Sequence, residues 1–397
     1  MVYHCKTSPL TAVNGKGYFV NTSGGAITIT LPSSPSAGDI IALKDYANTW
    51  DSNNVTIGRN SSKINGICED AKLDTESQSV TLIYVDGTKG WQSIQDGTSD
   101  VSGTSFIQAT GGTVSTVCTD YKLHTFTSDA NFVVSDAGSP ANNKVSYTIV
   151  AGGGGSSGDR AGGGGAGGFR EAKVPTDPYT DSPLDAGTGI TVTAQSYPIV
   201  VGAGGATDSS PPFGNGASGG NSSGLGVVSA GGGGGGRQPP GTGVAGGSGG
   251  GAGNVSPHGA VAGGSGNTPP VSPPQGNDGG QNGDGVPRYS TGGGGGAGTA
   301  GGNATQCTGG SAGNGVSTSI SSASVGYAGG GAGANDNPGM QGTPAGPFGG
   351  GTAATGNGGT DATNGTANRG GGGGGSAGST NGGSGGSGVV MIRYKFQ

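Results

Sequence analysis

Few residues in this chain are of the types that carry out catalysis or bind metal ions. The three histidines, His4, His124 and His258, have no partner at metal-ligand spacing, and no serine lies in a nucleophile elbow with an acid and a base. The glycine runs contain no Gly-Lys-Ser/Thr and none opens a helix after a strand, so they do not predict a phosphate-binding loop. Adjacent carboxylates such as Glu69 and Asp70 are typical of a solvated turn. We therefore expect no enzyme activity, no metal site and no cofactor.

Large aromatic residues in the second part of the chain are the stronger candidates for a binding role. They stand singly among glycines and prolines, where a regular backbone lattice has no room for a ring. At an exposed tip, such rings stack on sugars or fill a pocket of a protein receptor. The alternative is that each ring covers an end of the glycine region as part of a small core. Together with a histidine in a proline-flanked loop, the candidate receptor contacts are Tyr179, Phe213, His258, Tyr289, Tyr327 and Phe348.

Glycine divides the chain into two parts. Of the 98 glycines, 14 lie in residues 1–150, so glycine makes up about a third of the residues that follow. Unbroken runs at 231–236 and 370–375 exclude collagen, which needs glycine at every third position. Aperiodic glycine and proline usually predict disorder, but this region carries few charges and is interrupted by apolar segments. An ordered and a disordered glycine region both remain open, and we favour the ordered one.

Charge and cysteine content exclude several classes of protein. The net charge is −6, and residues 1–150 contain 9 basic and 13 acidic side chains, so no basic patch is available for nucleic acid. We expect no secretory signal, because the first ten residues, MVYHCKTSPL, lack a charged segment followed by an apolar one. We also expect no membrane insertion, because no apolar run approaches the ~20 residues of a membrane span. We expect free thiols, rather than a metal site or disulfides, from four cysteines without a CxxC pair, namely Cys5, Cys68, Cys118 and Cys307.

Residues 1–100 predict a domain of short β-strands. Residues 18–22 and 26–31 are separated by Ser-Gly-Gly, and the second segment alternates between apolar and polar residues, so the pair predicts a hairpin. The edge strands of so small a domain need cover, which the intertwining of three copies would provide. We therefore expect a homotrimer. Further strands are expected at residues 39–44, 55–57 and 80–85, followed by a turn that leads to Trp91.

Residues 101–150 and the end of the chain predict a β base for the glycine region. Residues 145–150 run directly into glycine, and residues 389–396 emerge from it. If these two strands pair, both ends of the glycine region are fixed in one sheet, and the region is an insertion rather than a free tail. His124 falls within a strand and is expected to be structural. The other strands expected here are 121–127, its short partner 131–134, and 197–201.

Ordered glycine runs have a geometry that can satisfy their backbone groups. A polyproline II helix has three residues per turn, a rise of about 3.1 Å and no internal hydrogen bonds. When every side chain is hydrogen, such helices can pack side by side and exchange N–H and C=O groups. Ordering costs about 1–2 kcal/mol per residue, which many cooperative hydrogen bonds have to offset. The fold expected is an all-β N-terminal region followed by packed polyglycine II helices on a small β base, with segments 1–100, 101–150, 151–388 and 389–397.

Several segments of the chain resemble known viral proteins. Val150-Ala151 followed by four glycines, and the close Gly-Val-Val-Met-Ile-Arg-Tyr at 388–394, resemble the glycine-rich domain of bacteriophage tail-fibre proteins, frequent in phages of marine bacteria. Residues 18–32, with Gly90-Trp91, are similar to β modules of cyanophage fibres. The resemblance covers most of the chain. T-even-like phage adhesins also build tips from packed polyglycine helices, but this chain departs from them in its long β front half.

The resemblance implies a virion fibre that is made in the host cytoplasm and recognises its receptor without catalysis. It implies a homotrimer that attaches to other tail or fibre proteins through its N-terminal region. The implied receptor is a host-surface glycan or an outer-membrane protein, contacted by those loops that face outward. Two alternatives remain: a purely structural spacer or decoration fibre on the tail or capsid, and a glycan depolymerase, although no carboxylate pair stands out.

Overall fold

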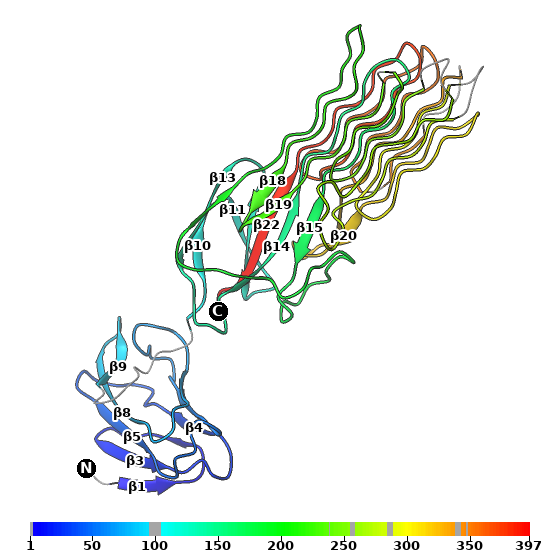
Figure 1. Ribbon diagram of the computed structural model, residues 1–397. Coiled ribbons are helices and arrows are strands. Elements are labelled where there is room, and N and C mark those ends of the chain that lie inside the picture. The colour runs from blue at the N-terminus through cyan, green and yellow to red at the C-terminus, as the bar shows by residue number, and fades with distance from the viewer. Residues whose placement is uncertain are drawn as a thin grey trace. The chain divides into compact units, whose positions relative to one another are not determined.

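The computed structural model describes residues 3–94, 105–237, 239–254, 259–283, 289–337, 343–346 and 348–397 (Figure 1). In these residues the chain is all-β, and no helix is present. It divides into two compact units, Met1–Phe106 with Ala137–Asn142, and Ile107–Asp136 with Asn143–Gln397. We call them the N-terminal unit and the glycine-rich unit.

The N-terminal unit consists of two sheets, and the chain alternates between them over its first six strands. Its core contains apolar side chains from both sheets, with Trp50 and Trp91 among the largest that are fully buried. The first sheet has the order β1 (Tyr3–Lys6), β3 (Lys16–Val20), β5 (Ile40–Asp45), β8 (Ser79–Asp86) and β9 (Gly90–Ile94). The second has the order β2 (Leu10–Thr11), β4 (Ile27–Thr30), β6 (Val55–Gly58) and β7 (Ala71–Leu73).

The hairpin predicted from residues 18–22 and 26–31 is wrong. Both segments contain strands, but β3 pairs in parallel with β1 and β5, whereas β4 pairs in parallel with β2 and β6 of the other sheet. Alternation of apolar residues shows only that one face of each strand is buried, and these strands bury those faces in one shared core. The strands expected at 39–44, 55–57 and 80–85 are confirmed as β5, β6 and β8.

The glycine-rich unit begins with a β base of two sheets. One has the order β10 (Gln108–Thr110), β13 (Ala130–Asp136) and β17 (Ser196–Ile199). The other has the order β11 (Thr113–Val117), β12 (Tyr121–Phe126), β22 (Val389–Lys395), β14 (Lys144–Val150) and β15 (Phe169–Ala172), and β16 (Ile190–Thr191) also pairs with β14. Two small hairpins are β18 (Ser222–Gly224) with β19 (Val227–Ser229), and β20 (Val316–Thr318) with β21 (Val325–Tyr327).

The base fixes both ends of the glycine region, as the sequence predicts. Strands β14 and β22 pair antiparallel, with Val150 opposite Val389, so the region leaves and re-enters the sheet at neighbouring positions. The predicted pairing of 131–134 with 121–127 is wrong, because β13 pairs with β10 and β17 while β12 pairs with β11 and β22. The run at 197–201 does contribute a strand to the base, β17, in the sheet of β13.

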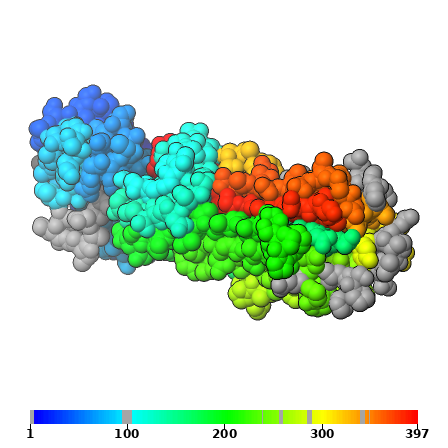
Figure 2. Space-filling view, turned by 90° about the horizontal axis from the view of Figure 1, so that it is seen from above, coloured from blue at the N-terminus to red at the C-terminus, as the bar shows by residue number. Residues whose placement is uncertain are grey.

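Beyond the base, most of the described residues between 151 and 388 form long runs that lie side by side (Figure 1). Figure 2 shows two of them from outside, where the red run that leads into β22 lies along the green run near residue 205. The hydrogen bonds between runs repeat every three residues. In the run 162–168, Gly162, Gly165 and Gly168 donate to O atoms of Gly236, Gly233 and Ala230, at 3.1, 2.8 and 2.8 Å.

The same run contacts six other runs through its backbone. Its remaining N–H groups donate to runs that contain Gly292 and Gly373, and its C=O groups accept from runs that contain Gly154, Gly251 and Gly331. Such close contact requires glycine. A Cβ added at Gly164 would lie 2.0 Å from the O atom of Gly154, and one added at Gly163 would lie 2.2 Å from that of Gly331. The interior of this region therefore consists largely of backbone, with a few alanine side chains buried among the runs.

Successive runs reverse direction, so their connections lie at two opposite ends. Phe169 donates to Gln275 and Gly168 to Ala230 beside the sheet, and we call this the base end. At the other end, Arg160 donates to Ala377, and Gly158 donates to Asp208. We call this the distal end. Consecutive loops thus alternate between the two ends, and the proline-rich loop 267–275 lies at the base end.

On the outermost runs, side chains take over hydrogen bonds that a further run would make. Asp361 Oδ1 accepts from the backbone N of Asn381 at 2.7 Å, and Asn364 Oδ1 accepts from that of Ser384 at 2.8 Å. The two acceptors are three residues apart, the same spacing as in the interior. Both side chains are exposed. Carboxylate and carboxamide oxygens thus complete the hydrogen bonding at this edge of the glycine region.

Candidate functional site

The distal end brings charged residues together at the turns between runs. Residues 156–161 close the first pair of runs, and within this turn Asp159 and Arg160 have φ of 54° and 68°. Ser379, in the turn that connects the last two runs, has φ of 58°. These left-handed conformations are costly for residues other than glycine and persist where the surrounding structure imposes them. The hydrogen bonds of the neighbouring runs impose them here, because each turn must join two runs of fixed position.

Two arginines and two aspartates form one ion-pair network at this end. Arg160 Nε lies 2.7 Å from Asp336 Oδ2, and Arg237 Nη2 lies 2.7 Å from Asp159 Oδ2. Arg160 Nη1 also lies 3.5 Å from Asp159 Oδ1. Asp336 is anchored further, because the backbone N of Gly378 donates to its Oδ1 at 2.6 Å. The network joins four segments that are far apart in the sequence.

Aromatic rings flank this network. The guanidinium carbon of Arg160 lies 4.5 Å from the ring centroid of Tyr289, and that of Arg237 lies 5.8 Å from the centroid of Phe213. A guanidinium group over an aromatic face is attracted by the ring quadrupole, so each ring also restricts the arginine beside it. Phe213 in turn packs on Gly158, where an added Cβ would lie 2.6 Å from its ring. The charged groups are therefore held in place from several sides.

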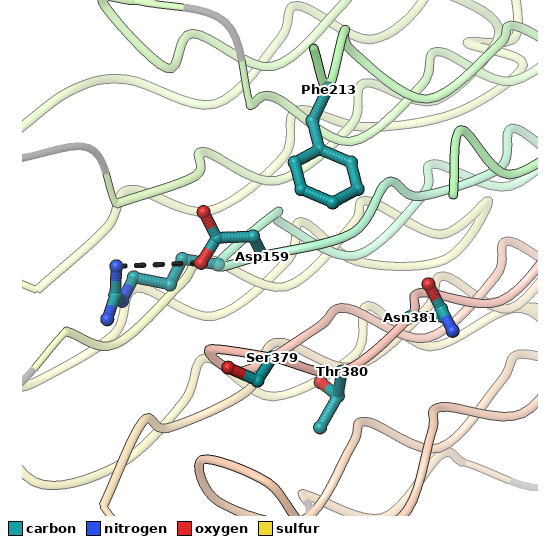
Figure 3. Close-up of a pocket in the computed structure, with 6 residues that line it drawn as sticks. Asp159, Phe213, Ser379, Thr380 and Asn381 are labelled. Atoms are coloured by element: carbon teal, nitrogen blue, oxygen red, sulfur yellow. Dashed lines mark ion pairs between the residues drawn. The ribbon is translucent and has the colours of Figure 1, made fainter. Parts of the chain in front are cut away.

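A hollow of about 520 Å³ opens beside the network. Figure 3 shows Phe213 on one side of it, Asp159 in the middle and the turn 379–381 on the other side. Thr380 is tied to its own turn through hydrogen bonds with Ala377. The Ser379 hydroxyl and Oδ1 of Asn381, by contrast, have no hydrogen-bond partner among the described residues. The lining residues are Asp159, Arg160, Phe213, Ser379, Thr380 and Asn381.

Of the six predicted contact residues, two lie at the distal end, three lie at the base end, and one lies outside the described residues. Phe213 and Tyr289 lie at the distal end and are half-buried. Tyr179 and Tyr327 are buried in the apolar cluster of the base, which leaves no ring face for a receptor. Phe348 is half-buried over Gly315 and Gly329 at the base end, and His258 lies outside the described residues. For Tyr179 and Tyr327, the alternative of a covering core is the one that the structure supports.

Sequence reasoning missed the charged residues of the network. The signal was present, because Asp159-Arg160 stand between two glycine runs and Arg237 directly follows six glycines. A charged residue at the end of a glycine run has to lie at an end of the glycine region, where the turns of neighbouring runs lie close together. Which turns share an end depends on the pairing of runs, and that pairing is not readable from segments that all consist of glycine. Asp336, Ser379 and Asn381 carried no such signal.

A second polar cluster is buried in the base. Glu171 Oε1 accepts from Thr318 Oγ1 at 2.5 Å, and its Oε2 accepts from the backbone N of Ser182 at 2.8 Å. Burial raises the pKa of Glu171 above its usual range, despite these hydrogen bonds. Burial likewise raises the pKa of Asp177. This cluster lies within the packed base, so we assign it to stability.

His124 is buried in β12, consistent with the structural role predicted for it. Its Nδ1 lies 2.7 Å from the O atom of Gly111, and its Nε2 lies 3.0 Å from the hydroxyl of Tyr394. Burial lowers the pKa of His124 and favours the neutral ring. Both ring nitrogens thus have partners inside the fold.

The described residues contain no cluster of three or more His, Cys, Asp or Glu side chains suited to a metal ion. Among the same residues, no disulfide joins the four cysteines, and all four are exposed. None of the described residues forms a helix with the length and apolar character of a membrane span.

Comparison with known proteins agrees with the division of the chain. A family model described as a glycine-rich domain matches residues 127–395, which is more than half of the chain. The chain therefore belongs to the glycine-rich domain family. The matched region covers most of the glycine-rich unit, including most of the β base and both strands that fix the glycine region. No curated protein matches the chain.

Proposed function

We propose that this protein is a non-enzymatic adhesin of a bacteriophage fibre, which binds a host-surface molecule through the distal end of its glycine-rich unit. The observation that carries the proposal is the hollow beside Asp159 and Phe213, where partly exposed polar groups and an aromatic ring meet. Ligand sites are typically concave and combine apolar surface with a few well-placed polar groups. The hollow has these properties and lies at the end of the unit opposite its β base.

The glycine runs serve this function as a rigid support. We propose that they are polyglycine II helices, because their hydrogen bonds repeat every three residues and a helix of this type has three residues per turn. Each run is fixed by several others, so the turns at the distal end have little freedom to move. A site whose groups are held before binding loses less conformational entropy when a ligand arrives.

The assembly belongs to the same proposal. We propose a homotrimer located on the virion, attached to other tail or fibre proteins through the N-terminal unit. Three copies would present three distal ends to one cell surface. Weak single sites then combine into strong attachment, because the second and third contacts form at high effective concentration.

Competition for adsorption tests the adhesin directly. The purified full chain is incubated with host cells before virions that carry the protein are added, and the unadsorbed virions are counted. We expect the chain to reduce adsorption in a concentration-dependent way. A variant with Phe213→Ala and Tyr289→Ala should need at least ten times more protein for the same effect, because both distal rings are lost.

The matched control is Phe348→Ala, which removes a half-buried ring packed on glycines at the base end. It should compete as well as the unchanged chain. If none of the three proteins reduces adsorption, the protein is a spacer fibre and the proposal fails. Release of reducing sugar from host envelope glycans would instead identify a depolymerase.

A further inference from the structure

We infer that the distal hollow binds one ring of a neutral saccharide, with Phe213 against the apolar face of the sugar. This inference names the ligand class of the site, and its biological meaning rests on the proposed adhesin function. Four observations carry it: the charge balance of the hollow, its lining, its size and its rigid construction.

The charges around the hollow argue against an anionic ligand. Arg160 and Arg237 are both neutralised by aspartates at 2.7 Å. Two more carboxylates lie next to the lining: Asp361 accepts from Asn381, and Asp208 accepts from the backbone of Gly214, the residue after Phe213. A phosphate or an acidic sugar would meet uncompensated carboxylates here, and like charges at short range repel. A ligand without charge avoids this cost.

The lining offers hydrogen bonds that suit hydroxyl groups. The Ser379 hydroxyl both donates and accepts, and Oδ1 of Asn381 accepts. The carboxylate of Asp159 has lone pairs beyond those engaged by the two arginines, because an ionised carboxylate offers about four acceptor sites. A sugar hydroxyl can donate and accept at once, so it satisfies such a mixed set better than a purely donating or accepting group.

The ring of Phe213 supplies the apolar part of the site. A pyranose ring presents C–H groups on its faces and hydroxyls around its rim, so a site for it needs one apolar wall and polar groups beside that wall. Figure 3 shows this arrangement, with Phe213 across the hollow from the turn 379–381. The hollow measures about 520 Å³, within the range of small-molecule sites of about 300–1,000 Å³.

The polar groups are also held in position. Asp159 and Ser379 lie in left-handed turns whose ends are tied to glycine runs. Glycine at either position would keep the backbone conformation and remove only the side chain. This property gives a clean variant: Ser379→Gly deletes the hydroxyl, and no backbone rearrangement is required.

Saturation-transfer NMR on the purified full chain tests the ligand class. The probes are the methyl glycosides of glucose, galactose, mannose and N-acetylglucosamine, compared with glucuronic, galacturonic and N-acetylneuraminic acids. We expect transfer to at least one neutral glycoside and none to the acids. Binding should change by less than twofold between about 50 and 500 mM salt, because no ion pair with the ligand is screened.

Variants locate the binding to the hollow. Phe213→Ala should weaken the binding of the neutral glycoside at least tenfold, and Ser379→Gly about fivefold, while Phe348→Ala should leave it unchanged. Circular dichroism and melting curves confirm that each variant is folded. Preferred binding of an acidic sugar, loss of binding in high salt, or equal binding by all variants would overturn the inference.

The two proposals fail in different ways. If the chain blocks adsorption but binds no neutral glycoside, the adhesin stands and the ligand class is overturned. If it binds a neutral glycoside in the hollow but does not block adsorption, the ligand class stands and the adhesin is overturned.

Discussion

The two units of this chain are stabilised in different ways. The N-terminal unit buries side chains: Trp50, Trp91 and the aliphatic residues of two sheets fill its core. In the glycine region, the interior consists largely of backbone with a few alanines, and hydrogen bonds between runs take the place of large side chains. Hydrophobic burial is non-directional, whereas hydrogen bonds are directional and have to be satisfied when buried. The comparison shows that a core can be built without large side chains if the backbone of every run is paired with its neighbours.

The two units also differ in the substitutions that their cores tolerate. An apolar core accepts substitutions that keep volume and pattern, because many side-chain arrangements fill the same space. A core of backbone has no side chains to rearrange, so the addition of one carbon atom forces whole runs apart. Inside the glycine region there is no room for larger side chains, so they are found at the turns and on the outermost runs. The distal turns are therefore where ligand-binding groups can be placed.

The largest expected effect comes from one methyl group at the centre of the glycine region. In Gly164→Ala, the new Cβ would lie 2.0 Å from the O atom of Gly154. We expect a loss of about 3 kcal/mol or more, because overpacking is costly and the neighbouring atoms are backbone that cannot rotate away. Hydrogen-exchange mass spectrometry should show lost protection throughout residues 151–388.

The control for Gly164→Ala is Gly24→Ala in the N-terminal unit. An added Cβ at Gly24 meets no atom within 4 Å, so the change should alter stability by less than about 0.5 kcal/mol. Normal protection of the glycine region in Gly164→Ala would contradict the view that its interior is close-packed backbone.

A deletion in the side-chain core is the next largest expected effect. Leu82→Ala removes a fully buried side chain of β8 and should destabilise the N-terminal unit by about 2–5 kcal/mol. Both tryptophans of the chain lie in this unit, so the urea midpoint of tryptophan fluorescence reports on it alone. Hydrogen exchange in residues 151–388 should stay unchanged. Coupled loss of protection there would show that the two units do not fold independently.

The comparison also explains what the sequence could and could not predict. Strands such as β5 and β8 were predictable, because apolar alternation marks a half-buried strand wherever it pairs. The pairing of the strands was harder to predict. The sequences of β3 and β4 predict a hairpin, because the alternation of apolar and polar residues does not reveal to which sheet a strand belongs. In the glycine region, the pairing of β14 with β22 was predictable from two apolar strands that flank the glycines. The distal network was not, because runs of one residue type carry no information on which run lies beside which.

We expect pH to have a moderate effect on the stability of the base. Burial raises the pKa of Glu171, so above pH 4.5 the folded state binds more protons than the unfolded state. The contribution of Glu171 to stability is therefore greatest at low pH and falls as the pH rises from about 4.5 through the raised pKa. Glu171→Gln keeps the hydrogen-bonding shape without a charge to desolvate. It should be more stable than the unchanged chain at pH 8, and the difference should disappear towards pH 4.

This measurement uses urea unfolding of the glycine-rich unit, followed by hydrogen exchange of peptides from β14 and β15. The difference in stability between the variant and the unchanged chain isolates the contribution of Glu171, because His124 and Asp177 titrate in both proteins. His124, whose pKa is lowered by burial, acts with the opposite sign below pH 6.5 and cancels in the difference. A constant difference from pH 4 to 8 would show that the pKa of Glu171 is the same in the folded and the unfolded state.

The smallest expected effect concerns the edge of the glycine region, where side chains rather than neighbouring backbone complete the hydrogen bonding. Asn364→Ala removes the acceptor for the backbone N of Ser384 on an exposed run. Because water can replace the lost acceptor, we expect only about 0.5–1.5 kcal/mol of destabilisation. The control is Thr366→Ala on the same run, whose exposed side chain makes no hydrogen bond to the described residues.

The exposed N–H group left by Asn364→Ala has a second consequence. An unpaired edge of backbone invites pairing with another chain, as the open edge of a β-sheet does. If side-chain acceptors such as Asp361 and Asn364 end the glycine region at a fixed number of runs, the double variant Asp361→Ala/Asn364→Ala should associate with itself at high concentration. Sedimentation velocity from about 1 to 100 μM, with Thr366→Ala as control, measures this association. Association of the control to the same extent would mean that the two side chains stabilise the edge without limiting its growth.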